Sequence, residues 1–234
     1  MEQAGLSKLQ PHRNLTETVY DALKGAIIDG SLATGYRLTE ASLASTFAVS
    51  TTPIREALTR LEREGLVSLL ARRGAVVVSF TADDVREVAE VRELLEAFAV
   101  RKAIERATPE MLARLRAIVE ECQPFVEIRD QRSFNRLDVE FHRLIVQTSG
   151  NRRLIRLFEM LHDQFQIIRL RVVQARGRPR VPHGEHVQIM AAIVAGDASE
   201  AERLLCWHIR HAASDLVGAG STGTGAGAAN VIGA

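Results

Sequence analysis

Aromatic residues and cysteines are scarce in this sequence. Only 5% of the 234 residues are aromatic, whereas 46% are hydrophobic, so the core must be built mainly from aliphatic side chains. That composition suits helical packing, and the length allows one or two domains. With only Cys122 and Cys206, a scaffold held by several disulfides is excluded. We expect both cysteines to be small buried hydrophobes in a reducing compartment.

Long apolar runs are also missing. A membrane-spanning helix needs about 18 to 20 consecutive apolar residues, and the sequence has no run of that kind. Residues 1–15 are polar and do not resemble a signal peptide. We therefore expect a cytoplasmic protein with no membrane partner.

The sequence has no large excess of charge of either sign. Thirty Lys and Arg are balanced by 29 Asp and Glu, which gives a formal net charge of +1. Residues 1–80 hold nine basic and eight acidic residues. Overall charge therefore does not predict nucleic-acid binding, and a basic patch would have to come from the placement of a few side chains.

The stretch from Leu38 to Val67 predicts a helix-turn-helix. Thr39 is a favourable N-cap for the first helix, and Ala48 to Ser50 form the turn. A second helix begins near Pro53, since proline is tolerated in a first turn, and it ends at Gly65. Apolar side chains recur at helical spacing in both helices: Leu43, Ala44 and Phe47 in the first, and Ile54, Ala57, Leu58 and Leu61 in the second.

A β-hairpin follows the second helix. Residues 66–70 and 75–79 are alternating or β-branched, and residues 71–74 form the turn between them. A helix-turn-helix followed by such a hairpin is a winged helix-turn-helix, and we expect this DNA-binding domain to span residues 1–80. The alternative is a small helical bundle with a hairpin that makes protein contacts.

A winged helix-turn-helix binds double-stranded DNA with its second helix in the major groove. Arg55 is the candidate base reader, because its planar fork can bond two guanine acceptors at once. Thr51 and Thr52 offer hydroxyl and methyl groups to base edges. We expect Arg72, Arg73 and Gly74 at the tip of the wing. Arg37 is either a phosphate contact or an ordinary surface arginine.

From residue 81 onward the sequence predicts an all-α helical bundle. Thr81 caps a helix that runs to about Ala107, and Thr108 starts the next, which is interrupted at Gln123–Pro124 and then reaches about Ile128. Further helices are expected over residues 133–149, 151–174, 185–195 and 199–217. The second domain then spans residues 81–217. Residues 218–234 are small and polar, and we expect a disordered tail there.

Four polar residues of the second domain lie on apolar helix faces. Asp138 and His142 are one turn apart in the stripe of Phe141. His186 and His208 each share a stripe with aliphatic residues on later helices. Burying one carboxylate and three imidazoles is costly unless they bind one another or a common ligand. A divalent metal ion, zinc, nickel, iron or manganese, is such a ligand.

The alternative is that each of these residues is a separately hydrogen-bonded core residue. The joint occurrence of four, two of them at i and i+4, favours a shared site. His162, His183 and His211 lack this support, although His183 is close enough to His186 in sequence to be a rival ligand.

Arg92 is a candidate for binding a small carboxylate effector. It falls in a helix stripe with Val88 and Ala99, where an unpaired guanidinium would be expensive. A carboxylate ligand would neutralise it with paired hydrogen bonds. The alternative is an ion pair with Glu96, four residues further along the same helix.

The N-terminal region resembles the DNA-binding domain of GntR-family bacterial transcription regulators over about residues 11–80. The family commonly has an arginine that contacts a base where this sequence has Thr51, so the operator is expected to differ at that step. The resemblance is carried by residues 35–40, Leu43-Ala44, residues 49–58, residues 61–67 and Arg73-Gly74.

The rest of the chain resembles the FCD ligand-binding domain of the FadR-like GntR subgroup over about residues 81–217. In metal-binding members the matching Asp and three His hold the ion beneath an effector pocket, which implies metal ligation by Asp138, His142, His186 and His208. An arginine at the position of Arg92 binds effector carboxylates in some members, which favours an effector role over the pair with Glu96.

These features predict a homodimeric, metal-containing transcription regulator that binds a palindromic operator and responds to a small organic acid. The resemblance implies repression relieved by the ligand. A metal-dependent hydrolase or lyase is the main rival, but no convincing separate general base is present, so we expect no enzyme activity. A second rival is a regulator with a purely structural metal.

Overall fold

The computed structural model describes residues 15–71, 73–176 and 182–220. The chain divides after Ser79 into two compact units, and each is described by itself. Within the described residues, no helix is both long and apolar enough to cross a membrane.

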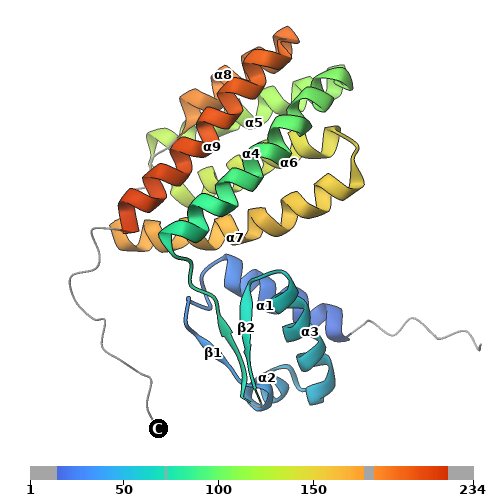
Figure 1. The fold of residues 1–234 in the computed structure, drawn as a ribbon, viewed down its shortest axis with the longest axis vertical. Helices are drawn as coiled ribbons and strands as arrows, with labels where there is room; N and C mark the ends of the chain where they lie inside the picture. Colours follow the sequence, from blue (N-terminus) through green and yellow to red (C-terminus); the bar gives the residue numbers. More distant parts are fainter. Residues whose placement is uncertain (1–14, 72, 177–181, 221–234) are drawn as a thin grey trace, which may run out of the picture. The chain divides into compact units, whose positions relative to one another are not determined.

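The N-terminal unit is a winged helix-turn-helix, as predicted (Figure 1). Its three strands form an antiparallel sheet in the order β1-β3-β2. The helix α1 and the short strand β1 were not among the elements expected from the sequence. The elements are α1 (Leu15–Ile28), β1 (Arg37–Leu38), α2 (Glu40–Phe47), α3 (Thr51–Arg63), β2 (Val67–Leu70) and β3 (Gly74–Val77).

Local sequence signals set the ends of α2 and α3. The side chain of Thr39 accepts a hydrogen bond from the Ser42 amide and caps α2. Ala48 has left-handed backbone angles in the turn, and Gly65, with φ 71°, lies just beyond α3. The predicted apolar stripe of α3 is fully buried. The stripe of α2 is only half-buried, because this eight-residue helix packs mainly against α3.

The C-terminal unit is all-α, as predicted. Pro124 does not interrupt α5, which continues to Glu127. The helix α8 begins two residues before its expected start, and α9 continues to Gly220, past the expected start of the tail at Gly218. Residues 221–234 lie outside the described residues. The helices are α4 (Ala82–Glu105), α5 (Pro109–Glu127), α6 (Gln131–Thr148), α7 (Arg152–Arg176), α8 (His183–Ala195) and α9 (Ala198–Gly220).

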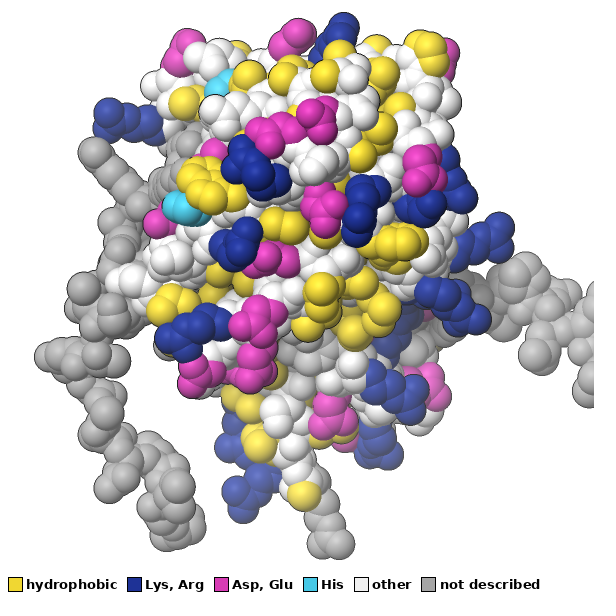
Figure 2. Space-filling view, turned by 45° about the horizontal axis from the view of Figure 1, so that its top comes forward, with side chains coloured by type: hydrophobic (Ala, Val, Ile, Leu, Met, Phe, Trp, Pro, Cys, Tyr) yellow, Lys and Arg dark blue, Asp and Glu magenta, His cyan; other side chains and the backbone are white. Residues whose placement is uncertain are grey.

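Apolar side chains also reach the surface of this unit. Figure 2 shows hydrophobic side chains emerging between charged ones. On α4, Val91, Leu94 and Phe98 are 44%, 73% and 41% exposed. Their spacing of three and four residues places them on one face of the helix.

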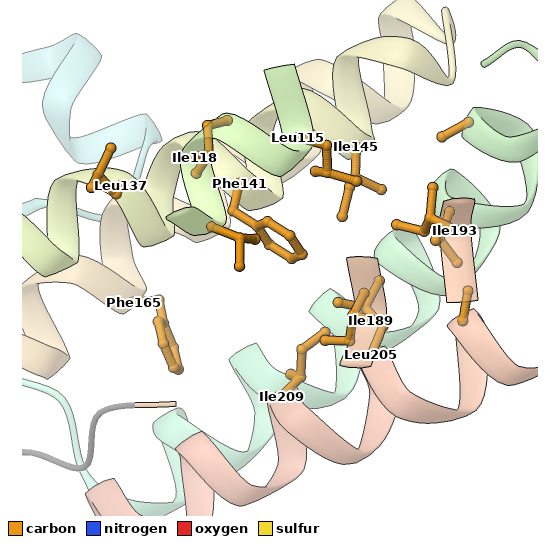
Figure 3. Packing of buried hydrophobic residues seen from close by; sticks show 14 of the residues in the cluster. Leu115, Ile118, Leu137, Phe141, Ile145, Phe165, Ile189, Ile193, Leu205 and Ile209 are labelled. Carbon is orange, nitrogen blue, oxygen red and sulfur yellow. The ribbon is translucent and has the colours of Figure 1, made fainter. Parts of the chain in front are cut away.

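The core of the C-terminal unit is largely aliphatic, as the composition predicts (Figure 3). Leu115, Ile145, Ile189 and Leu205 come from four different helices and are each buried. Cys122 is buried in the same cluster, and burial raises the pKa of its thiol to about 12. These contacts pin α6, α8 and α9, the helices that carry the candidate site.

We expect Gly74→Ala to destabilise the N-terminal unit far more than Gly35→Ala. Both glycines have a positive φ, 89° and 80°, so either alanine is strained by about 1–3 kcal/mol. A Cβ at Gly74 would also lie 2.0 Å from the carbonyl oxygen of Leu38, whereas Gly35 has open space. The backbone clash should add about 1–3 kcal/mol. Equal free energies of unfolding in urea for the two variants would contradict this.

Candidate functional site

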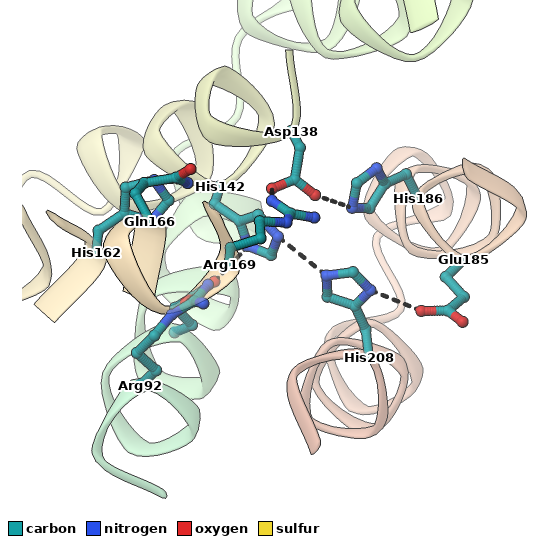
Figure 4. Close-up of polar contacts among 10 residues, drawn as sticks. Arg92, Asp138, His142, His162, Gln166, Arg169, Glu185, His186 and His208 are labelled. Atoms are coloured by element: carbon teal, nitrogen blue, oxygen red, sulfur yellow. Dashed lines mark hydrogen bonds and ion pairs between the residues drawn. The ribbon is translucent and has the colours of Figure 1, made fainter. Parts of the chain in front are cut away.

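Four buried side chains converge inside the C-terminal unit: Asp138 and His142 from α6, His186 from α8 and His208 from α9. One ligand atom from each lies within 4.8 Å of the others. Figure 4 shows them pointing toward a common centre. His183, the rival ligand, lies at the start of α8 and is not part of this group.

Packing explains why these side chains point inward. Asp138 and His142 lie on the face of α6 that buries Phe134, Phe141 and Ile145. The ring of Phe141 stacks on His186, with centroids 4.5 Å apart. The buried face of each helix thus carries its polar residues into the core together with its apolar ones.

Two carboxylates orient two of the imidazoles. Glu96 on α4 lies 2.6 Å from Nδ1 of His142, and Glu185 on α8 lies 2.7 Å from Nδ1 of His208. Burial alone would raise the pKa of Glu96, but the charge of Arg92, followed by the interaction with His142, lowers it to about 2. An ionised carboxylate only accepts hydrogen bonds, so Nδ1 of His142 carries the proton. If Glu185 is ionised as well, its bond assigns the proton of His208 to Nδ1.

The other ring nitrogens are then left with lone pairs that face each other. Nε2 of His142 and Nε2 of His208 are 3.1 Å apart. Burial, followed by the nearby His142, lowers the pKa of His208 to about 3, which keeps its ring neutral. Two acceptors at this distance repel each other unless a positive charge lies between them.

Asp138 and His186 complete the set of unpaired atoms. Oδ1 of Asp138 and Nε2 of His186 are 3.3 Å apart, yet both are buried and neither makes a hydrogen bond. Oδ2 of Asp138 accepts from Arg169 on α7. Burial would raise the pKa of Asp138, but the charge of Arg169 holds it well below its usual value. Asp138 is therefore an ionised carboxylate with one oxygen free to bind a cation.

The donor set fits a divalent metal ion. Four buried ligand atoms converge, each with an unshared lone pair, and imidazole with carboxylate suits zinc, nickel, iron and manganese. Glu96 and Glu185 lie where carboxylates of metal sites accept a hydrogen bond from a metal-binding histidine and so fix the orientation of its ring. Burying these lone pairs without a cation would be costly.

Arg92 is buried and paired with Glu96. Its Nη2 lies 2.7 Å from Oε1 of Glu96, and its guanidinium lies over the ring of Phe165 at 4.3 Å. The pair with Glu96, the alternative considered from the sequence, is thus present. It links α4 to His142, because Glu96 bonds both residues.

A second polar group lies on the inward face of α7. His162, Gln166 and Arg169 are all buried and are spaced four and three residues apart. Nε2 of His162 lies 3.1 Å from the side-chain nitrogen of Gln166, while Nδ1 of His162 is buried without a partner. Sequence reasoning missed this stripe, although the flanking Phe158 and Phe165 mark the same face as buried. His211 is exposed and packs against Trp207.

The candidate DNA-binding residues lie in the N-terminal unit. Thr51, Thr52 and Arg55 are exposed in the first turns of α3, and Arg37 and Arg73 are exposed on and beside the strands. Arg55 is held by Glu40 of α2. Arg72 lies outside the described residues.

Gly74 begins β3 and pairs with Leu70, directly beside the turn of the hairpin. It is buried, and its backbone packs against Leu38 and Thr39. Its observed role is therefore the close approach of β3 to β1, which needs a residue without Cβ.

Two family models match the chain. Residues 15–77 match "Bacterial regulatory proteins, gntR family", and residues 87–211 match the FCD domain.

Relatives of known name or structure cover most of the chain. The uncharacterized HTH-type transcriptional regulator YdhC of Bacillus subtilis (strain 168) is 33% identical over 82% of this chain and 86% of its own length. The solved structure of E. coli McbR/YncC is 26% identical, with a TM-score of 0.76 over 88% of this chain and 98% of that one. The Zn²⁺-bound FCD domain of TM0439 is 22% identical, with a TM-score of 0.51, and covers 62% of this chain and 99% of that one. The last comparison shows a shared fold alone.

Proposed function

The chain belongs to the gntR family of bacterial regulatory proteins, and from this premise we propose that it is a metal-containing repressor released from its operator by a small organic acid. Its relatives and domains are those of a transcription regulator and not of an enzyme. The observation that carries the metal and effector part is the convergence of four buried ligand atoms, two of which, on Asp138 and His186, have no hydrogen-bond partner.

We place DNA recognition on the first turns of α3. Arg55 reads a base, while Thr51 and Thr52 contact neighbouring groups in the major groove. The first turn of α3 has no acidic residue, so its backbone amides and positive dipole end favour a phosphate. Arg37, Arg72 and Arg73 are the proposed phosphate or groove contacts around this helix.

Recognition of DNA by α3 favours a homodimer, since a two-fold dimer binds a palindromic operator with one α3 in each half-site. The apolar stripe of Val91, Leu94 and Phe98 on α4 supports an interface with a second copy of this chain.

Arg55→Ala should cost about 1–3 kcal/mol of operator binding and relax one base preference. Arg63→Ala is the matched control, because Arg63 is an exposed arginine at the other end of the same helix. Both variants lose one positive charge, so a difference between them reports base reading. Binding is measured at fixed salt on a duplex that the wild type selects from a random pool. Equal losses in the two variants would remove Arg55 from the reading role, and failure of the wild type to select any duplex would overturn the DNA function.

For the metal, we propose ligation by Asp138, His142, His186 and His208. When bound, the ion supplies a Lewis-acidic position to which an oxygen ligand can bind. Glu96 and Glu185 hold two of the rings in place, and Arg169 holds Asp138. The zinc ion stated for the FCD domain of TM0439 makes zinc one of the ions to test.

Protein purified without chelator should contain about one divalent ion per chain. The ion should also stabilise the fold, because it binds the folded site and not the unfolded chain. His142→Ala and His208→Ala should lose the ion and melt at a lower temperature, while His211→Ala, at an exposed position, should keep both properties. Metal content by mass spectrometry and melting curves test this. Wild type that neither contains metal nor gains stability from zinc, nickel or manganese would rule the site out.

Charge balance supports an anionic effector. The groups bonded to one another at the site include three carboxylates, Asp138, Glu96 and Glu185, and two guanidinium groups, Arg92 and Arg169. Imidazoles that bind a metal ion are neutral, so with all three carboxylates ionised a divalent ion would leave one excess positive charge in a buried environment. A bound carboxylate would neutralise that charge, and burial makes such neutralisation valuable.

Arg92 and His162 are the proposed contacts for the rest of the acid. Glu96 occupies only the Nε and Nη2 groups of Arg92, which leaves donors of its guanidinium available to a second carboxylate. If Gln166 donates to Nε2 of His162, then Nδ1 of His162 is a buried donor without an acceptor. An oxygen of the acid would satisfy it.

His162→Phe should keep metal and operator binding but weaken the response to the acid. The phenyl ring preserves the stacking on Phe158 and removes only the polar nitrogens. Operator affinity is measured with a panel of small monocarboxylic, hydroxycarboxylic and dicarboxylic acids, and we expect the right acid to change it by about five-fold or more in wild type.

His211→Phe is the control and should respond as wild type does. If the same acid acts equally on wild type and His162→Phe, then His162 belongs to the scaffold. If no acid acts on a metal-loaded wild type, the metal is structural.

A further inference from the structure

Arg55, the proposed base reader, is not free in the structure. Its Nε donates to Oε1 of Glu40 at 3.1 Å, and its Nη2 donates to Oε2 of Glu40 at 2.7 Å. Exposed single ion pairs usually contribute little, but two parallel bonds between a guanidinium and a carboxylate define one orientation. The side chain of Arg55 is 67% exposed, so this orientation is presented to the solvent and is not fixed by packing.

The bonds to Glu40 use one particular edge of the guanidinium. Arginine has five N–H donors, one on Nε and two on each terminal nitrogen. Glu40 occupies the edge formed by Nε and Nη2. The other edge, formed by Nη1 and the second hydrogen of Nη2, stays open with two parallel donors. Those donors match the two major-groove acceptors of guanine, O6 and N7.

The charge of Glu40 disfavours the other common use of an arginine, which is to bind a phosphate. The hydrogen bonds from Arg55 lower the pKa of Glu40, so its carboxylate is ionised near neutral pH. A phosphate that approached Arg55 would meet this negative charge at close range and be repelled. The edge of a guanine base is uncharged, and its acceptors meet no such repulsion.

The backbone around Glu40 is well supported. Glu40 is the first residue of α2, directly after the cap residue Thr39. Gly74 of β3 packs against Leu38 and Thr39 at the same point. The strand that closes the wing thus supports the helix end from which Glu40 reaches Arg55.

We propose that Glu40 is a positioning residue that holds the fork of Arg55 for guanine in the operator. The proposal rests on the proposed DNA-binding function and adds a residue that acts without reading a base itself. A protein that relied on Arg55 alone would let the side chain exchange between base and phosphate contacts.

The test uses Glu40→Gln in the full chain, with Glu17→Gln as the matched control. Glu17 forms a comparable exposed ion pair with Arg60, at 2.8 Å, in the same unit. The wild type first selects a duplex from a random pool, and Arg55→Ala identifies the base pair that depends on Arg55. Affinity is then measured for duplexes carrying each base pair at that step, and circular dichroism and melting curves verify that each variant is folded.

We expect the base pair that depends on Arg55 to contain guanine, and Glu40→Gln to lower the preference for it by about five-fold or more. Affinity for unrelated duplexes should stay equal or rise, because a negative charge is lost near DNA. Glu17→Gln should keep the preference.

Three outcomes would overturn the proposal: another base at that step, an unchanged preference in Glu40→Gln, or an equal loss in Glu17→Gln. A wild type that selects no duplex would instead refute the DNA-binding function on which the proposal rests. Should Glu40→Gln fold poorly, Glu40→Ala with the same measurements replaces it.

Discussion

The mutual neutralisation of buried charges is the constraint on which the C-terminal unit depends. Arg92, Glu96, His142 and Asp138 are all buried, and an isolated charge at any of these positions would be very costly. Each is tolerated because its neighbours supply the opposite charge or a hydrogen bond: Glu96 serves both Arg92 and His142, and Asp138 serves Arg169. These bonds join α4, α6 and α7 through side chains that come from distant parts of the sequence. The apolar core around them fixes the distances that make this compensation possible.

Sequence patterns predicted those features of the fold and of the candidate site that lie within single helices. Asp138 and His142 are one turn apart, so their shared face follows from helical periodicity, and the caps Thr39, Thr81 and Thr108 follow from local hydrogen bonding. The helix α3 could also be predicted from the sequence, because Gly65 marks its end and the apolar stripe marks its buried face. The all-α character of the second unit needed nothing beyond the spacing of its apolar residues.

Partners that depend on packing between helices could not be predicted in this way. Nothing local assigns Arg169 to Asp138, 31 residues away, or Glu96 to His142, 46 residues away. For Arg92 the sequence allowed two interpretations, a contact with an effector carboxylate and an ion pair with Glu96. The sequence placed Gly74 in the turn of the wing, but it could not show that the backbone of Leu38 fills the position of a Cβ at this residue. The α2 stripe was expected to be buried, but burial depends on how many elements cover a helix, which its own sequence does not record.

The buried thiol of Cys122 bears on which metal ions the candidate site could hold. A cysteine reacts with oxidants and binds soft ions as the thiolate, and a pKa of about 12 keeps Cys122 in the thiol form at neutral pH. The negative charge of the Asp138 carboxylate contributes to that shift after burial itself. The donor set then consists of nitrogen and oxygen atoms alone. Soft ions such as copper(I) gain no thiolate ligand here, and the site is matched to ions of intermediate hardness.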